Sequence, residues 1–418
     1  MNAWQRLHPL SPAVRAGRAL IAIGIIFLPT LVSGGTNNWD VAWHVFAVGA
    51  LIVLGFVSWL VTRWRIDGND LRIETGLLRR SSKRYPLSQV QAIDTVRPGL
   101  ARALGLAELR LRMGGTGGAA RLAYLPVVQA NAVRARLLAL SQGAHEETPE
   151  PTDRELVRVP PGRVAASLVL SGPAVVLVVY VVALGAAISS GRHGLLGPTL
   201  PILLGDAIAI WRRFNRSFHA TVAEAPEGLR IRSGLVETTD ETIPRGRVQA
   251  VHLVEPLLWR PFGWCRLEVD VAGRVRDRSD AERGKRRLRT LLPVGTGAEA
   301  AQLVELLVPG APQPQRRPPR RARWKSPLLY RRLSFAFDEH YAVTTAGRVA
   351  RTASWVPLTK VQSLRRLEGP AQRRLRLATV YLDTAGKNFG AAFRDVDGRD
   401  SQALLERLTE LARAARRA

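Results

Sequence analysis

Cysteine is almost absent from this chain, since Cys265 is the only one in 418 residues. A single thiol excludes an intramolecular disulfide framework, a four-cysteine zinc site and a cysteine-ligated iron–sulfur cluster. Lysine is also scarce, so arginine supplies 56 of the 61 basic residues, against only 34 acidic ones. The resulting net charge of +27 indicates an anionic partner or surface, either nucleic acid or the inner face of a membrane.

The sequence also lacks the usual signs of catalysis. Its seven histidines are scattered, with no H-E-x-x-H motif and no pair spaced for one helix face. The glycine-rich run at 113–118 lacks the Lys and Ser/Thr of a phosphate-binding loop, which favours a hairpin turn. Cys265 stands where the repeat described below otherwise has Ala107 and Ala378, so we expect a buried, inert thiol. We therefore predict no enzyme activity, no metal and no cofactor.

Four long stretches carry almost no charge, residues 19–39, 41–62, 164–191 and 193–211. Each has 19 or more residues, and a helix of roughly 20 apolar residues crosses a bilayer core. The first stretch lacks a clear signal-peptide cleavage site and is soon followed by a second one. The pattern predicts two transmembrane helical hairpins.

Basic residues near the ends of these stretches predict their orientation. They flank the outer ends of both hairpins, while the first intervening turn has none and the second has only Arg192; the flanking residues are Arg15, Arg18, Arg63, Arg65, Arg163, Arg212, Arg213 and Arg216. We expect a multi-pass protein of the cell membrane, with both termini and every large soluble segment in the cytoplasm.

Outside these stretches, one motif occurs three times: YPLSQVQAI at 85–93, IPRGRVQAV at 243–251 and VPLTKVQSL at 356–364. A second motif begins 13 residues after Gln91, Gln249 and Gln362 in every copy. Alternating apolar residues predict short β-strands in each repeat, and each ends in a helical pattern, at 126–140, 297–308 and 401–415. Antiparallel strands closed by one C-terminal helix are the order of elements in a pleckstrin-homology (PH) domain.

These motifs, together with the N-terminal RLHPLSP and the helical hairpin, resemble the bacterial PH-domain membrane proteins of the YdbS/YdbT type, in the longer YdbT-like form. The resemblance covers essentially the whole chain. It implies helical hairpins in the membrane plus an α+β part, in which three PH-like β-sandwich or barrel domains are each closed by a C-terminal helix. The third repeat departs at Arg376, where the first two have Gly105 and Gly263.

The predicted organisation divides the chain into seven parts. They are an N-terminal segment with hairpin 1 (1–64), PH-like domain 1 (65–145), an acidic linker (146–162), hairpin 2 (163–214), PH-like domain 2 (215–308), a basic Pro-rich linker (309–325) and PH-like domain 3 (326–418). The Pro-containing connector at 145–155 and the basic linker are both expected to be extended and exposed.

Three sets of residues are candidates for binding. The basic clusters are candidates for anionic-lipid contact and comprise Arg274, Arg276, Arg283, Lys285, Arg286, Arg287, Arg289, Arg316, Arg317, Arg320, Arg321 and Arg323. The residues that recur in the repeat, where a structural role is favoured over an anion contact, are Gln91, Arg102, Gln249, Arg260, Gln362 and Arg373. Asp206 is the only acidic residue inside a predicted span, which makes it a candidate for an intramembrane function.

The sequence thus predicts a non-enzymatic integral membrane protein whose cytoplasmic PH-like domains contact a protein partner or anionic phospholipid. Two alternatives stay open: a transporter or membrane-embedded enzyme that uses Asp206, and a membrane-tethered nucleic-acid binder. The latter is disfavoured because no helix-turn-helix, RNP motif or zinc finger is present.

Overall fold

The structure is a computed structural model, and it describes residues 4–12, 14, 46, 49–50, 53, 56–57, 59–68, 70–76, 81–113, 119–141, 153–191, 196–226, 228–271, 288–385 and 391–417. The chain divides into two compact units. Unit 1 contains Met1–Thr152, Val236–Thr242 and Arg274–Arg276; unit 2 contains Asp153–Leu235, Ile243–Gly273 and Asp277–Ala418. The predicted first hairpin lies almost entirely outside the described residues.

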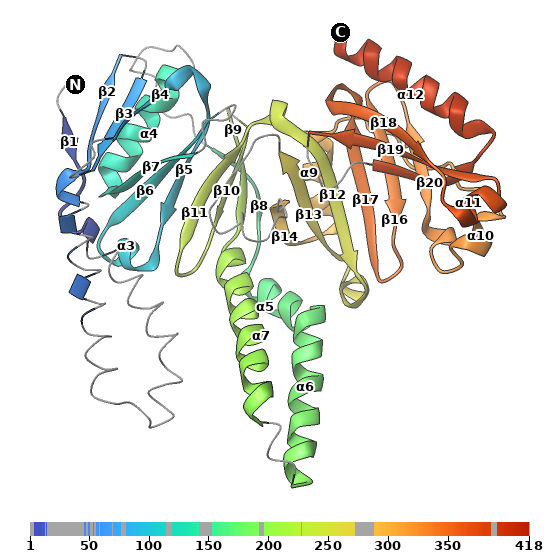
Figure 1. The fold of residues 1–418 in the computed structure, drawn as a ribbon, viewed down its shortest axis with the longest axis horizontal. Coiled ribbons are helices and arrows are strands. Elements are labelled where there is room, and N and C mark those ends of the chain that lie inside the picture. Colours follow the sequence, from blue (N-terminus) through green and yellow to red (C-terminus); the bar gives the residue numbers. More distant parts are fainter. Residues whose placement is uncertain are drawn as a thin grey trace. The chain divides into compact units, whose positions relative to one another are not determined.

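Unit 1 holds the first repeat (Figure 1). Its first sheet has the order β1-β2-β3-β4, formed by Gln5–Arg6, Arg63–Asp67, Asp70–Thr75 and Ser81–Pro86. The later elements are β5 (Val90–Arg97), α3 (Gly99–Ala103), β6 (Leu106–Met113), β7 (Ala119–Pro126) and α4 (Val127–Ser141). Trp64, Leu71, Ile93, Leu109 and Leu137 are buried together, so that α4 closes one core with both sets of strands.

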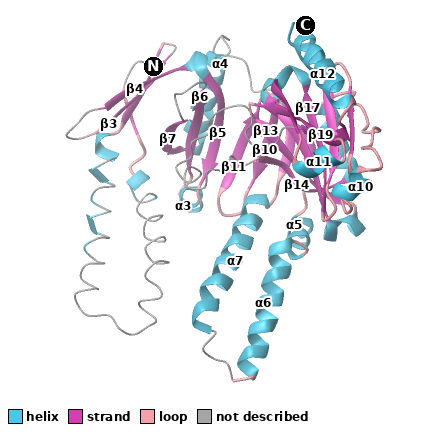
Figure 2. Ribbon diagram, turned by 45° about the vertical axis from the view of Figure 1, so that its right-hand side comes forward, coloured by secondary structure: helices cyan, strands magenta, loops and turns pink. Residues whose placement is uncertain are grey.

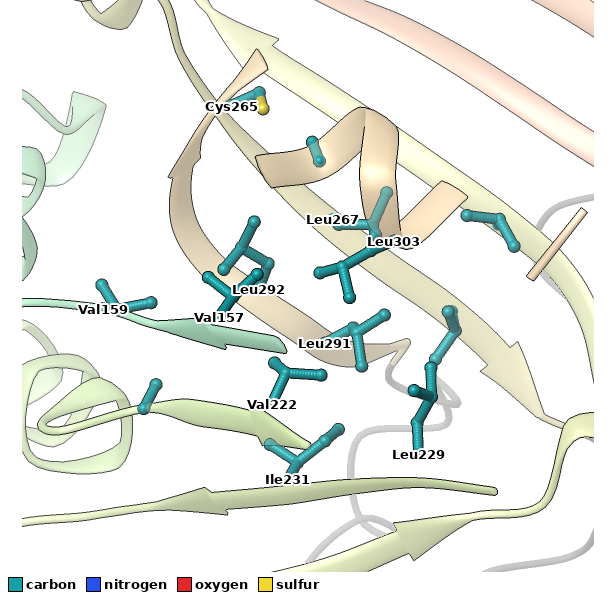
Figure 3. Close-up of a cluster of buried hydrophobic side chains, with 14 of the residues drawn as sticks. Val157, Val159, Val222, Leu229, Ile231, Cys265, Leu267, Leu291, Leu292 and Leu303 are labelled. Atoms are coloured by element: carbon teal, nitrogen blue, oxygen red, sulfur yellow. The ribbon is translucent and has the colours of Figure 1, made fainter. Parts of the chain in front are cut away.

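Unit 2 begins with β8 (Arg154–Arg158) and continues through three helices and two strands, α5 (Pro161–Val169), α6 (Gly172–Ser189), α7 (Leu196–Ser217), β9 (Thr221–Ala225) and β10 (Gly228–Ser233). The second repeat is completed by β12 (Val248–Pro256), the 3₁₀ helix η4 (Leu257–Phe262), β13 (Trp264–Val271), β14 (Arg289–Thr296) and α9 (Gly297–Leu307). Cys265 and Leu267 lie in a core shared with Val222 and Leu303 (Figure 3). Val269, the next alternate position of β13, is buried in the same core.

The third repeat starts with α10 (Ala322–Lys325), β15 (Ser334–Phe337), β16 (Tyr341–Ala346) and β17 (Ala350–Pro357). It ends with β18 (Val361–Leu367), α11 (Pro370–Arg374), β19 (Leu377–Thr384), β20 (Ala391–Asp397) and α12 (Asp400–Arg417). The apolar face of α12 covers this last sheet through Leu408 and Leu411, which share a core with Phe393. The same helix-closed order of strands therefore occurs three times, as the sequence predicts.

Strands also continue from one repeat into the next. In unit 1, β5 pairs antiparallel with β11 (Thr238–Ile243), a strand from the second repeat. In unit 2, β12 of the second repeat pairs antiparallel with β17 of the third, giving the order β14-β13-β12-β17-β16-β15. The described strands form no closed barrel (Figure 2). A barrel would require two edge strands of the same repeat to pair, but one of these edges pairs with a strand of the next repeat instead.

Each first sheet is covered at its outer edge by a short upstream segment. Gln5 pairs with Trp64, Val157 with Val222, and Arg316 with Phe335. The three paired residues stand at the same position of their repeats, namely Trp64, Val222 and Phe335. The covering segment is therefore repeated too, like the two sequence motifs and the closing helix. Arg316 is extended and exposed, as expected for the basic linker, and its backbone also pairs with Phe335. The expectation of an exposed connector is wrong at Asp153, whose carboxylate is mostly buried and accepts bonds from Arg230 and Arg232 at 2.8 and 3.1 Å.

The third repeat has Arg376 where the first two repeats have glycine, but its backbone keeps the same turn conformation. Arg376 has φ +52°, close to the +66° and +63° of Gly105 and Gly263. A non-glycine residue in this left-handed region is strained. The backbone carbonyl of Arg376 accepts a bond from the Gly398 amide at 2.8 Å and one from the Arg321 side chain at 3.1 Å, which hold the turn in place.

Candidate functional site

The three repeats differ most in the interval between the covering segment and the strand that it pairs with, which is β2, β9 or β15. In the second repeat this interval holds α5, α6 and α7, and the last two helices pack side by side and extend away from the strands of unit 2 (Figures 1 and 2). Among the described residues, α6 is the one helix long and apolar enough to cross a membrane, with a mean hydropathy of 2.2 and none of that window buried.

The stretch 164–191 is divided into two helices with different surroundings. α5 packs on the β framework: the Trp259 indole donates to the Ser167 carbonyl at 3.0 Å, and Arg163 pairs with Glu299 at 2.7 Å. Ser171 then caps α6 by accepting from the Ala174 amide, and Pro173 follows in its first turn. The exposed apolar surface begins at Val169, the last residue of α5, which is 70% exposed, and continues along α6, with Val179 and Val182 exposed by 62% and 66%.

The first repeat has the same kind of surface in its interval, residues 7–62, as far as that segment is described. Phe46, Val53, Phe56 and Leu60 are helical and exposed, and their spacings of seven, three and four residues place them on one face. A polar contact fixes the end of this helical segment to the N-terminal segment, because the Trp59 indole donates to the Leu7 carbonyl at 2.9 Å.

The third repeat has no hairpin, and its interval, residues 317–333, carries a short exposed loop. Trp324 and Leu328 are exposed by 76% and 63%. Exposed basic side chains surround them along the chain, namely Arg317, Arg320, Arg323, Arg331 and Arg332. We call residues 317–332, which include the short helix α10, the basic–aromatic loop. Sequence analysis found three of these arginines but missed Trp324 and Leu328, although the motif R-W-K-S-P-L-L contains both.

The base of this loop is clamped to the third repeat by buried polar groups. Asp395, whose side chain is 2% exposed, pairs with Lys325 at 2.5 Å. It also accepts bonds from Gln372 at 2.7 Å and Ser326 at 3.2 Å. Arg321 pairs with Asp397 at 2.5 Å, so its charge is engaged by the protein and the loop is fixed at this end.

The candidate lipid-binding residues are thereby divided. Six lie outside the described residues: Arg274, Arg276, Arg283, Lys285, Arg286 and Arg287. Arg289 lies in β14, and Arg316 holds the edge of β15 with its guanidinium 5.0 Å above the Phe337 ring. Arg317, Arg320 and Arg323 remain on the exposed basic–aromatic loop.

The recurring residues do not form one site. Arg260 donates to the carbonyls of Arg348 and Val349 at 2.6 and 3.2 Å, which fixes the β16–β17 turn next to η4. Arg373, at the same position of the third repeat, has an exposed side chain, and the described residues give it no such bond. Gln249 is buried and donates to the Arg247 carbonyl, whereas Gln362 is exposed. The Gln91 side chain lies outside the described set, and Arg102 lies in α3.

Two titratable groups of the second repeat have shifted pKa values. Burial lowers the pKa of His252 to about 4; its Nδ1 lies 2.8 Å from the Ser354 hydroxyl across the β12–β17 junction. Burial, reinforced by Glu255 and Glu299, raises the pKa of Cys265 to about 12. Because the thiolate is the reactive form, the Cys265 thiol is inert, in agreement with the expectation from its place in the repeat.

Asp206 lies on α7, partly exposed, two turns before the arginines that end this helix. Within the described part of the chain no group of three or more His, Cys, Asp or Glu side chains is arranged to hold a metal.

Tandem repeats of antiparallel strands, each closed by a C-terminal helix and without a catalytic cluster in the described residues, define a protein of PH-like domains. The comparison with family models agrees: the bacterial PH domain family matches residues 19–141, 165–292 and 301–412. The chain therefore belongs to the bacterial PH domain family. No curated protein matches it.

Proposed function

We propose that this is a non-enzymatic integral membrane protein whose three PH-like domains lie at the cytoplasmic face of the cell membrane and contact anionic phospholipid or a protein partner there. PH domains act in protein or lipid interaction, which supports an interaction role for the three repeats. The finer assignment to a membrane rests on where exposed apolar residues occur in the repeat.

The observation that carries the proposal is the repeated position of this surface. In all three repeats the interval between the covering segment and the first strand holds exposed apolar side chains, on helices in the first two and on the basic–aromatic loop in the third. Leaving such a surface in water is unfavourable, and α6 alone exposes Val175, Val176, Val178, Val179, Val181 and Val182. A bilayer would cover it.

The basic–aromatic loop favours anionic lipid as one contact of the third repeat. Trp prefers the interface between hydrocarbon and headgroups, and each basic residue near an anionic leaflet contributes about 1 kcal/mol. Its three predicted arginines and Arg331 and Arg332 carry charge next to Trp324 and Leu328. The other candidate partners, nucleic acid and a substrate transported past Asp206, gain no support from a site in the described residues.

Membrane insertion and topology are tested with reporter fusions in the cell. Fusions after Ser81, Glu150 and Ala418 should report cytoplasm, and fusions after Gly35 or Gly191 should report the outside, because arginine flanks the cytoplasmic ends. The protein should also resist extraction by alkaline carbonate. Release of the full chain by carbonate, or an external signal from any of the first three fusions, would contradict the proposal.

Lipid contact is tested separately on the full chain in nanodiscs. Leu328→Cys in a Cys265→Ala background would be labelled with a polarity-sensitive dye. Its emission should shift to the blue in discs with anionic lipid and stay unshifted in neutral discs, and the shift should weaken from 0.1 M to 1 M salt as the screening length falls from about 10 to about 3 Å. The matched control is a dye at Val349, which is 72% exposed but has no place on the loop. Equal spectra in both discs would remove the lipid claim and leave a protein partner.

A further inference from the structure

The two junctions between repeats use the same strand edges in the same register. Leu253 of β12 lies opposite Ala353 of β17, and Thr95 of β5 lies opposite Asp240 of β11. Leu253 and Thr95 both stand four residues after the repeated glutamine, and Ala353 and Asp240 both stand three residues before the residue that opens the nine-residue motif. Two independent junctions thus agree position by position, which makes the edge-to-edge contact a property of the repeat.

The same two edges are left open at the ends of the array. β18 is the third-repeat counterpart of β5 and β12, and among the described strands it pairs only with β19. β4 is the first-repeat counterpart of β11 and β17, and in the same described set it pairs only with β3. Both are accessible: the residues Ser81–Arg84 of β4 and Arg365–Leu367 of β18 are exposed. Open edges of this length pair readily with another strand.

We propose that β18 of one chain pairs antiparallel with β4 of a second copy of the same chain, in the register of the two internal junctions. This register places Lys83 opposite Arg365 and Ser82 opposite Arg366. The occupant is a second copy because β4 is the edge that the repeat itself presents to a β18-type strand, and because the contact continues an interface that the chain already makes twice. This inference does not depend on the proposed membrane contact.

Arg373 supports this assignment from outside the strands. In the second repeat, Arg260 anchors the turn of the incoming hairpin through two carbonyls. Arg373 occupies the same position beside β18, exposed to solvent and without such a bond among the described residues. It is therefore available for the hairpin that enters with β4. Arg374 is equally exposed but has a different position in the repeat, so it provides a matched control.

Charge makes this contact weaker than the internal ones. Lys83 and Arg365 carry like charges directly opposite each other, which opposes pairing. The adjacent Asp383 offsets part of this repulsion, since it accepts bonds from Arg365 at 2.5 and 2.9 Å. Association should therefore increase with salt, and it should increase when Lys83 is replaced by an acidic residue.

The contact joins two different edges, β18 of one chain and β4 of another. Each chain therefore binds one copy through its β18 and a second copy through its β4. Such heterologous contacts give rings or open rows instead of symmetric dimers.

The test is disulfide cross-linking between two full-length chains with different tags, co-expressed in membranes. Both carry Cys265→Ala, which the repeat already tolerates at Ala107 and Ala378; one also carries Lys83→Cys and the other Arg365→Cys. Opposite Cα atoms of antiparallel strands lie about 4.5–5.5 Å apart, within reach of a disulfide. Oxidation should give a dimer that contains both tags. Replacing Lys83→Cys by Ser82→Cys should lower its yield at least tenfold, because that side chain points to the other face of the sheet.

A second measurement uses chains with neither engineered cysteine. Co-purification of two differently tagged copies should rise several-fold with Lys83→Glu and fall several-fold with Arg373→Ala, while Arg374→Ala should leave it unchanged. In the cross-linking experiment, covalent dimers that contain a single tag would indicate symmetric pairing and overturn the proposal. So would a product that joins the Arg365→Cys chain to a different protein, and so would the absence of any mixed dimer together with no response to Lys83→Glu.

Discussion

The second and third repeats share their strands but are held at their entrances in different ways. In the second repeat, α5 leads into the helix pair and is fixed by the Arg163–Glu299 pair and the Trp259–Ser167 bond. In the third, α10 replaces the whole helical insertion and is fixed by Asp395 with Lys325. The interval before the first paired strand of a PH-like repeat therefore tolerates either a large helical insertion or none. In both repeats a polar clamp fixes the chain at this place.

The clamps also differ in burial, which makes their strengths unequal. The Asp395 carboxylate is 2% exposed, whereas the side chains of Arg163 and Glu299 are 22% and 26% exposed. Charge pairs are worth more, and cost more to break, when water cannot reach the group that is left. Four changes would break or sharpen this comparison.

The largest effect is expected at the clamp of the third repeat. Lys325→Ala leaves the buried carboxylate of Asp395 without its charged partner, with only the bonds from Gln372 and Ser326, and removing one partner of a buried pair typically costs about 3–5 kcal/mol. Hydrogen exchange of peptides from β19 and β20 should accelerate strongly, while peptides from β13 keep their protection. Glu410→Ala, on the exposed face of α12, is the control. An unchanged exchange rate in β19 would show that the clamp is dispensable.

Acid should destabilise the second repeat through His252. Its pKa is about 4 in the folded protein, against an ordinary value of 6.5, so the unfolded chain takes up the proton first. This contribution is zero above pH 6.5, and stability then falls by up to about 3 kcal/mol as the pH drops to 4. The third repeat has Arg365 at this position and should lack the effect. His252→Asn should flatten the pH profile of β12 exchange; an unchanged slope would contradict this account.

Glu299→Ala tests the more exposed clamp of the second repeat. Burial disfavours ionisation of Glu299, but bonds from Arg163 and the Thr296 amide outweigh it and hold its pKa below the ordinary value. The carboxylate also completes the capping box of α9 with Thr296. We expect a loss of about 1–2 kcal/mol, measured by pulse proteolysis of the full chain, with Glu305→Ala as a control on the same helix. A loss as large as that of Lys325→Ala would erase the difference between the clamps.

The smallest change should be a gain. Arg376→Gly places glycine at the φ of +52° that the first two repeats already fill with glycine. Relief of left-handed strain should stabilise the third repeat by about 1 kcal/mol. Gly263→Arg is the reciprocal change and should destabilise the second repeat by a similar amount. Pulse proteolysis reports both, and a loss of stability in the first variant would mean that the Arg376 side chain stabilises the fold by more than its backbone strain costs.

The repeats were predictable because the sequence keeps their spacing, down to the 13 residues between the repeated glutamine and the second motif. The buried role of Cys265 followed from the same alignment. The shared sheets were not predictable, because a strand such as β12 shows the same alternation whether its edge is free or paired. Nor was the fate of Arg316 and Arg321, since their partners Phe335 and Asp397 are chosen by tertiary structure. Charge density alone had grouped both with the arginines that are free for lipid contact.

The β5–β11 pairing has a consequence for synthesis on the ribosome. β5 ends at Arg97, but its partner begins only at Thr238, after the second helical segment. At about 5–20 residues per second, the first repeat waits roughly 7–28 s before the strand that covers its edge has been made. During this delay a nascent chain presents an open β-edge beside neighbouring nascent chains, which are a ready source of wrong partners. Slowing translation between the first and second repeats should therefore increase aggregation of the newly made protein.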